Sequence, residues 1–251
     1  NIFITKNEFK PVVTKDLSDA LHAALDNPLL DQMPANMNWF FNEWIYNAGQ
    51  PEFKVDYTYD ESSKEIILNA KQVQRMDSSS VFKTPVPIEI ITETGRQSIT
   101  METSADVKTY KIKVDSKPLN VNFNKGNKVL CKLYFSKPKN DWLYQLNNSP
   151  DAIDRLTALN GLKDFLNDDD VINAIKGKMR NDSFWGVRCE AVKVLSTSKN
   201  KSVTEVYMKN MIDERDSRVR RTYLLQLGTL LNNHPEEKEN TAVLQYFLTN
   251  L

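Results

Sequence analysis

A helical pattern that repeats about every 33 residues is the feature that most restricts how this chain can fold. An arginine and two apolar residues recur three times, with offsets of 33 and 32 residues, and further helical stripes follow each copy. The copies are Arg155, Leu159 and Leu162; Arg188, Val192 and Leu195; and Arg220, Leu224 and Leu227. The stripes are Val171, Ile175 and Met179; Val203, Tyr207 and Met211; and Val243, Tyr246 and Phe247. Paired helices at this period predict an α-solenoid, in which each pair buries its apolar face against its neighbours.

Three signals for helix starts support this prediction. Ser149-Pro150-Asp151 places an N-cap residue before a proline and an acid, as in a first helical turn. Asp168-Asp169-Asp170 puts negative charge at the start of another helix, and it lacks the glycine and terminal glutamate of a calcium loop. Ser202-x-x-Glu205 forms a capping box. From Ser149 onward the pattern is therefore helical.

In residues 52–136 the spacing of the apolar residues changes from a period of 3.6 to a period of 2, which indicates β-strands. Apolar and polar residues alternate in seven runs, and turn signals such as Thr94-Gly95-Arg96 separate them. The runs hold Phe53, Val55, Tyr57 and Tyr59; Ile66, Leu68 and Ala70; Val86, Ile88 and Ile90; Ile99 and Met101; Tyr110, Ile112 and Val114; Val121 and Phe123; and Val129, Leu133 and Phe135. Seven short strands at this spacing predict an antiparallel β-sandwich or barrel.

The first 50 residues have a helical pattern with a large apolar face. Thr5 and Glu8 form a capping box, a first stripe predicts a helix that Pro28 ends, and Gly49 and Pro51 stop a second helical stretch. The two stripes are Leu17, Leu21, Ala24 and Leu25, then Trp39, Phe40, Phe41, Trp44 and Ile45. We expect part of this apolar surface to lack a partner within the chain, because the segment is too short to bury it.

Composition excludes several classes of protein. Thirty-three lysines and arginines balance thirty-three aspartates and glutamates, whereas nucleic-acid binders and polybasic membrane binders need an excess of positive charge. No run of eighteen apolar residues occurs, so no membrane span is expected. An apolar content of 40% with four Trp, nine Tyr and eleven Phe is enough for a packed core.

Residues that carry catalysis or bind metals are scarce. His22 and His234 have no second ligand at helical spacing, and Cys131 and Cys189 cannot supply a disulfide framework or a four-thiolate zinc site. We interpret both cysteines as buried, reduced thiols. A glycine-rich phosphate loop is also missing. The sequence therefore offers no catalytic, cofactor-binding or metal-binding residue.

A basic cluster of Arg218, Arg220 and Arg221 is the candidate binding site. Because Arg220 belongs to the recurrent pattern, the favoured interpretation is structural: it pairs with an acid such as Asp182 or Asp216 between repeats. The alternative is that the cluster contacts an anionic partner, for instance the terminal carboxylate of a peptide. Acids at positions 213, 214 and 216 lie alongside and would neutralise much of the positive field.

The most specific string runs from Trp39 to Phe53, WFFNEWIYNAGQPEF, and Lys71-Gln72-Val73-Gln74 follows it. These segments resemble the aminopeptidase-N family of zinc metallopeptidases (gluzincins, M1 peptidases). In that family a W-x-x-x-x-G-x-P element closes the catalytic domain, a strand carries a K-Q-x-Q-like segment, and a HEAT-like helical domain completes the chain. The resemblance covers essentially the whole sequence. It implies terminal helices of a thermolysin-like catalytic domain at 1–50, an antiparallel β-sandwich at 51–138 and a HEAT-like α-solenoid at 139–251.

The catalytic motifs of that family are missing here. A His-Glu-x-x-His helix with a downstream Glu binds zinc in the family, and a Gly-x-Met-Glu-Asn-like strand binds the substrate amine, whereas this sequence has no His-Glu pair. The resemblance therefore implies a piece of a longer protein. The parent would bind zinc and remove amino-terminal residues from peptides. This region would be inactive alone, and it would pack on its own upstream catalytic domain as a spacer and a lid.

Two alternatives to this interpretation stay open. In the first, the parent is a scaffold or protein-interaction module descended from an enzyme whose zinc motif has degenerated. In the second, the chain is an independent adaptor whose sandwich and solenoid bind protein partners. The location stays open between the cytoplasm and the periplasm or secretion, because the resemblance implies that a targeting signal would lie upstream.

Overall fold

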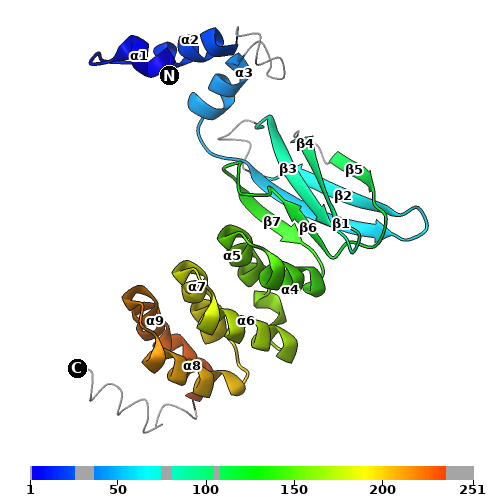
Figure 1. The fold of residues 1–251 in the computed structure, drawn as a ribbon, viewed down its shortest axis with the longest axis vertical. Helices are drawn as coiled ribbons and strands as arrows, with labels where there is room; N and C mark the ends of the chain where they lie inside the picture. Colours follow the sequence, from blue (N-terminus) through cyan, green and yellow to red (C-terminus); the bar gives the residue numbers. More distant parts are fainter. Residues whose placement is uncertain (1, 26–36, 75–80, 104–107, 236–251) are drawn as a thin grey trace.

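The computed structural model describes residues 2–25, 37–74, 81–103 and 108–235. Three parts follow one another along the long axis: helices at the amino-terminal end, two β-sheets in the middle and a stack of helices at the other end (Figure 1). The sheets followed by helical repeats confirm the predicted fold class.

The amino-terminal helices are short. α1 spans Ile2–Asn7, α2 spans Thr14–Leu25, and α3 (Asn38–Phe40) continues into a π-helical turn, η2 (Phe41–Ile45). The predicted capping box of Thr5 and Glu8 is wrong, because Thr5 lies inside α1 and not before it.

The helix predicted from Leu17 and Leu21 is present as α2. The Asp16 carboxylate accepts a hydrogen bond of 2.9 Å from the Val13 amide, which satisfies one of the free N–H groups at the helix start. Pro28, which we expected to end the helix, lies outside the described residues. Among residues 2–24 only Ala20 is buried, so these helices have no core of their own.

Seven described strands form two sheets that pack face to face. One sheet has the order β5-β2-β1-β7 and the other has the order β4-β3-β6. The strands are β1 (Glu52–Asp60), β2 (Glu65–Gln72), β3 (Thr84–Ile91), β4 (Arg96–Thr103), β5 (Lys108–Lys113), β6 (Asn120–Phe123) and β7 (Lys132–Ser136). Both sheets share one hydrophobic core, across which the rings of Phe53 and Phe123 meet with centroids 5.3 Å apart. The region is therefore a sandwich, as its period of 2 predicted.

The prediction that every pair of strands is antiparallel is wrong in one place. β1 pairs in parallel with β7, whereas the other described pairs are antiparallel. The chain leaves the first sheet after β5, passes through β6 in the second sheet and returns as β7. Such a crossover connection allows parallel pairing, which a hairpin does not.

The first helix of the solenoid begins before Ser149, where the sequence signals placed the first helix start. α4 spans Lys139–Asn148, and Ser149 ends α4 as its C-cap, so Ser149 does not start a helix. Asp151 is the N-cap of the next helix instead. The remaining elements are α5 (Ala152–Gly161), a 3-10 turn η3 (Lys163–Phe165), α6 (Asp169–Asn181), α7 (Trp185–Ser196), α8 (Ser202–Asp213) and α9 (Ser217–Asn233).

The other two predicted helix starts have different outcomes. The acids at 168–170 stand at the start of α6, with Asp168 as its N-cap, as predicted. The capping box of Ser202 and Glu205 is wrong, because Ser202 is already helical. The side chain of Asn200 accepts a hydrogen bond of 3.0 Å from the Ser202 amide and takes the capping role.

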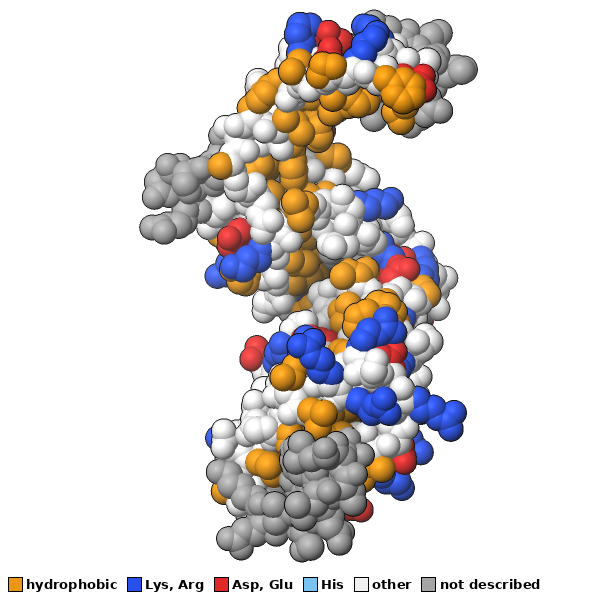
Figure 2. Space-filling model, turned by 90° about the vertical axis from the view of Figure 1, so that its left-hand side faces the viewer, with side chains coloured by type: hydrophobic (Ala, Val, Ile, Leu, Met, Phe, Trp, Pro, Cys, Tyr) orange, Lys and Arg blue, Asp and Glu red, His pale blue; other side chains and the backbone are white. Residues whose placement is uncertain are grey.

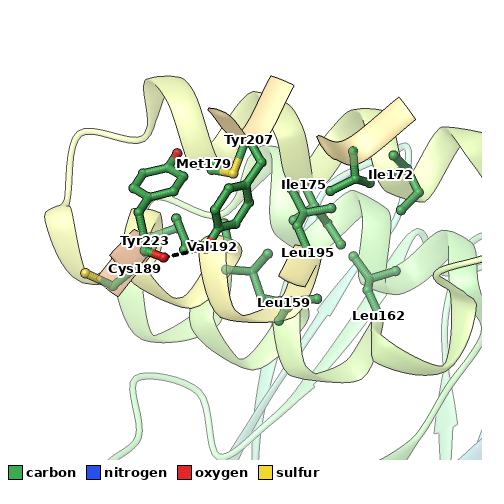
Figure 3. Packing of buried hydrophobic residues seen from close by; sticks show 14 of the residues in the cluster. Leu159, Leu162, Ile172, Ile175, Met179, Cys189, Val192, Leu195, Tyr207 and Tyr223 are labelled. Carbon is green, nitrogen blue, oxygen red and sulfur yellow. Dashed lines mark hydrogen bonds between the residues drawn. The ribbon is translucent and has the colours of Figure 1, made fainter. Parts of the chain in front are cut away.

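Two layers of helices, α4-α6-α8 and α5-α7-α9, enclose the core of the solenoid (Figures 1 and 3). Apolar residues of the predicted repeats fill it, among them Leu159, Val192 and Tyr207. The third copy departs from the pattern at Leu224, which is 43% exposed, because no described helix packs against that side of α9. The predicted stripe of Val243, Tyr246 and Phe247 lies outside the described residues.

Candidate interaction sites on the solenoid and at its junction with the sandwich

The recurrent arginine has a structural role in the first two repeats. The Arg155 guanidinium binds the carboxylate of Asp182, the C-cap of α6, at 2.8 and 2.9 Å. Arg188 binds the carboxylate of Glu214, the C-cap of α8, at 3.0 and 3.2 Å. Each arginine–acid pair therefore ties the first turn of one helix, α5 or α7, to the end of the helix that follows it, α6 or α8.

The start of α9 positions the predicted arginine cluster. Asp216 is the N-cap of this helix, and its carboxylate accepts a hydrogen bond of 2.9 Å from the Arg218 amide. The same carboxylate binds the Arg218 guanidinium at 2.7 Å, and the guanidinium carbon lies 4.0 Å from the centroid of the Trp185 ring. The hydrogen bonds from Arg218 hold the pKa of Asp216 well below its usual range. Arg218 is therefore anchored within the solenoid.

The three arginines of the cluster do not converge on one point. Arg220 and Arg221 are exposed. Successive helical residues rotate by about 100°, so Arg221 lies roughly 60° from Arg218 around the axis and Arg220 roughly 160° from it. Other arginines occupy Asp182 and Asp216, so the predicted pairing of Arg220 with either acid is wrong. Arg218 and Arg221 share a face of α9, and Arg220 lies on another.

The histidines and cysteines hold structural positions. His234 is the C-cap of α9, and the Nε2 atom of its buried ring lies 2.9 Å from the Ser198 carbonyl oxygen. His22 Nδ1 lies 2.8 Å from a backbone carbonyl oxygen of α2. Both thiols are free; Cys189 is buried, and burial raises the pKa of the half-buried Cys131. Within the described ranges, no three His, Cys, Asp or Glu side chains come together in a way that could hold a metal ion.

Lys137, which the sequence analysis did not single out, lies buried where the sandwich meets the solenoid. Its Nζ atom donates hydrogen bonds to the Asn120 side chain at 2.6 Å, the Gln145 side chain at 2.5 Å and the Val121 carbonyl at 3.2 Å. It also lies 4.0 Å from the centroid of the Trp142 ring. Burial lowers its pKa to about 7. Lys137 thus ties β6 to α4 through polar contacts.

Two further contacts complete this junction. Tyr57 of β1 donates a hydrogen bond to Asp141 of α4, and burial raises the pKa of both groups. Lys125, in the turn after β6, forms ion pairs with Asp151 at 2.6 Å and with Asp154 at 2.5 Å. Polar and charged groups therefore hold the sandwich and the solenoid together.

Several cavities lie at the junction, and two of them are large. One of about 630 Å³ lies between β7 and α5, and one of about 840 Å³ lies between β1 and α4. The larger cavity is lined by Glu61, Glu93 and Lys117 among others. The linings of these two cavities contain no histidine or cysteine, so neither offers the groups of a zinc or thiol catalyst.

Residues that carry the family resemblance meet at the start of the sandwich. The Gln72 side chain donates to the Phe82 carbonyl at 2.6 Å and accepts from the Phe82 amide at 3.0 Å. The Gln74 side chain accepts a hydrogen bond of 3.2 Å from the Glu52 amide. The rings of Trp44 and Phe82 pack with centroids 4.9 Å apart. Gln72 thus holds Phe82 in place, and Trp44 packs the π-helical turn against that ring.

The helices from α4 to α9 have a counterpart among known families. Residues 140–228 match HEAT repeats. This match begins in α4 and ends within α9, so it includes both arginine–acid pairs. It confirms the helical repeats that the sequence pattern predicted.

The whole chain is similar in fold to a crystal structure of Legionella pneumophila aminopeptidase A in complex with aspartic acid. The TM-score is 0.62 at 12% sequence identity, and the similarity covers 97% of this chain and 34% of the Legionella protein. The chain thus spans about a third of that protein, and at this identity the similarity is one of fold. No curated protein matches the sequence significantly. None of the described helices is long and apolar enough to cross a membrane.

Proposed function

We propose that this chain is the non-catalytic carboxy-terminal region of a zinc-dependent aminopeptidase, with the sandwich as a spacer and the solenoid as a lid over the active site. The observation that carries the proposal is the fold similarity of 97% of the chain to about a third of an aminopeptidase. The order of helices, sandwich and HEAT repeats supports it, and so do the contacts among Trp44, Gln72 and Gln74 and their neighbours.

Exposed apolar side chains at the amino-terminal end support an additional domain as partner. Figure 2 shows hydrophobic side chains gathered over the helices at this end. Phe9 is 99% exposed and Val13 is 67% exposed. The predicted stripe is exposed only in part, because Phe41 is buried and Trp44 packs on the sandwich. Since contiguous exposed apolar residues mark interaction surfaces, we assign this surface to the upstream catalytic domain of the parent.

In this proposal the zinc of the parent is bound by residues upstream of this chain. The chain contributes by shape and by remote contacts. A lid restricts which peptides enter by excluded volume, and binding energy gained away from the reacting bond assists catalysis. Arg221 is exposed on the same face of α9 as Arg218, whose guanidinium already binds Asp216, and it is the arginine of the cluster that we assign to peptide contact; a guanidinium group binds a peptide carboxylate through paired hydrogen bonds.

The upstream coding sequence tests the proposal against its rivals. An intact His-Glu-x-x-His motif with a downstream Glu is expected for the peptidase. A degenerate motif would instead leave a scaffold, and an open reading frame starting near Asn1 would indicate an independent adaptor.

Activity measurements provide a second test. The parent protein should hydrolyse amino-acid arylamides and lose this activity to a chelator, whereas the 251-residue chain with added zinc should show none. Robust, chelator-sensitive hydrolysis by this chain alone would overturn the proposal. In the parent, Arg221→Glu should raise the KM for long peptides and leave arylamide hydrolysis unchanged.

A further inference from the structure

Strand β7 is an edge strand of the first sheet, and its free edge faces a hollow beside α5. The first sheet ends in β5 and β7, and the second ends in β4 and β6. Residues of β7 and α5 line the cavity of about 630 Å³ at the junction (Figure 1). They also line a smaller cavity of about 230 Å³. The two cavities share Leu133, Phe135 and Thr157 in their linings, so they adjoin, and together they form what we call the β7 groove.

Two residues of β7 direct their backbone groups toward this groove. The Lys132 amide donates to the Pro51 carbonyl at 3.0 Å, and β7 then pairs in parallel with β1 as far as Ser136. The N–H and C=O groups of one strand residue point to the same edge, and those of the next residue point to the opposite edge. Those of Leu133 and Phe135 therefore point away from β1, and they have no hydrogen-bond partner within the described part of the chain. The edge thus offers two donors and two acceptors to an extended backbone.

The two cavities of the groove lie on opposite faces of β7. Lys54 and Asp56, on the outer face of the first sheet, line the larger cavity, and Phe123 of the sandwich core lines the smaller one. Because side chains of successive strand residues point to opposite faces, an added strand would place them alternately in the two cavities. Polar residues in the lining of the smaller cavity, such as Asn124 and Asp154, are already hydrogen-bonded within the chain. The smaller cavity therefore fits an apolar side chain, and the larger cavity fits a polar one.

Two of the other edges are protected against an added strand. β5 carries three lysines, and lysines on an edge strand disfavour pairing with another chain. α4 packs on β6, and the Lys137 ammonium group binds the Val121 carbonyl of that strand at 3.2 Å. The one lysine of β7, Lys132, forms an ion pair with Glu52 of β1 at 3.5 Å. The edge of β7 thus lacks both kinds of protection and opens into a groove instead.

We propose that the β7 groove binds an extended peptide segment, which adds to the first sheet as a further strand and pairs with the free backbone groups of β7. Such strand addition takes affinity from the main chain and specificity from pockets for alternate side chains. α5 lies across the groove, so a single segment reaches the edge, whereas the whole sheet of a second copy does not.

Charge specifies the segment further. In the larger cavity Lys54 and Lys137 are balanced by Asp56 and Asp164, and Asp154 of the smaller cavity forms an ion pair with a lysine of the sandwich. The groove has no excess of either sign, so the segment that complements it carries no net charge and has an apolar residue at every second position. This inference does not depend on the proposed function.

Binding can be measured on the whole chain by fluorescence anisotropy, with a labelled peptide in which valine alternates with serine and both ends are blocked. Two further peptides carry N-methyl groups, one on its valine amides and the other on its serine amides. We expect the unmodified peptide to bind saturably. One methylated peptide should bind about tenfold or more weakly, because its hydrogen bonds to β7 are lost, while the other keeps most of its affinity. An equal loss with both, or no loss with either, would contradict strand addition.

Asn160→Trp should fill the groove, because this exposed residue of α5 lines both cavities. We expect it to weaken peptide binding about tenfold or more and to leave the Tm unchanged. Lys209→Trp is the matched control, at an exposed position of α8 outside both linings, and should change neither value. No binding of the unmodified peptide, or binding that survives Asn160→Trp, would overturn the proposal. Dimerisation that Asn160→Trp abolishes and the peptide does not inhibit would overturn it too, and would assign the edge to a second copy.

Discussion

The Arg155 guanidinium binds the Asp182 carboxylate through two hydrogen bonds of 2.8 and 2.9 Å, and both side chains are almost completely buried. The same guanidinium donates to the carbonyls of Ser149 and Pro150, while Asp182 also accepts from the Phe184 amide. One ion pair thus satisfies backbone groups just before α5 and just before α7, at the two ends of a repeat. In the first two repeats the arginine of the sequence pattern is therefore a packing element, whereas Arg220 of the third copy is exposed.

Asp182→Ala should lower the free energy of unfolding by about 3 kcal/mol or more, because it leaves the Arg155 charge buried without its partner. The loss should be smaller for Glu214→Ala, since the Arg188 and Glu214 side chains are 15% and 11% exposed, compared with 9% and 3% for Arg155 and Asp182. Urea unfolding of each variant measures both values. Equal losses would show that burial does not set the strength of these pairs. Asp19→Ala, at an exposed pair, is the control and should change little.

Gly161→Ala should destabilise the junction by about 1–3 kcal/mol, because its new methyl group would overlap the indole ring of Trp142. That ring is confined by Phe135, at 6.0 Å between centroids, and by the Lys137 ammonium group. Gly177→Ala is the matched control in α6, where nothing lies within 4 Å of the added methyl. It should stabilise by up to about 1 kcal/mol through helix propensity. Thermal unfolding of the two variants should therefore shift in opposite directions.

The repeats and strands could be read from the sequence because their burial is periodic. Phe53, Val55 and Tyr57 alternate with exposed residues in β1, as their spacing predicted. No apolar stripe marked α4, although it lies within the predicted helical domain, because Asp141 and Gln145 share its buried face with two apolar residues. Asp141 pairs with Tyr57 of a distant strand, and Gln145 with Lys137 and the Asp154 carbonyl outside α4, so no local pattern reveals that these polar residues are buried.

The polar surroundings of the Tyr223 hydroxyl could not be predicted from the sequence, for a related reason. Tyr223 belongs to the buried stripe of α9 with Val219 and Leu227, so its spacing indicates a core residue. That interpretation holds for the ring and fails for the hydroxyl. Whether a buried hydroxyl has a partner depends on how neighbouring helices end, here near Asn210, and periodicity carries no information about that. The parallel pairing of β1 and β7 was hidden in the same way.

The pH dependence of stability should carry the signature of Lys137. Its pKa is about 7 in the folded chain, compared with an ordinary value of 10.5 when the chain is unfolded. Between these values the unfolded chain holds a proton that the folded chain has lost. The free energy of unfolding therefore rises with pH in this window, by at most about 1.4 kcal/mol per pH unit. Below the folded-state pKa, Lys137 makes no contribution that changes with pH.

Comparing Lys137→Met with the unaltered chain isolates this contribution, since all other titrating groups are shared. The difference in unfolding free energy between the two should change from neutral to alkaline pH. Asp141 and Asp154 are the acids whose charges raise the pKa of Lys137. Asp141→Asn should therefore move the start of the rise to lower pH. Parallel pH profiles for the chain and for Lys137→Met would contradict the prediction.

The exposed apolar surface at the amino-terminal end should make the chain self-associate or bind a hydrophobic dye in isolation. Phe9 and Val13 are the most exposed large apolar residues there, together with Ile4 at 67%. Phe9→Asp with Val13→Asp should reduce dye fluorescence and association, because charged groups interrupt the patch. Leu130→Asp is the control, since it changes a 70% exposed side chain on the sandwich, away from this surface. Light scattering measures the association, and dye titration measures the exposed apolar surface. A strictly monomeric chain that binds no dye would remove the reason to assign this surface to a partner domain.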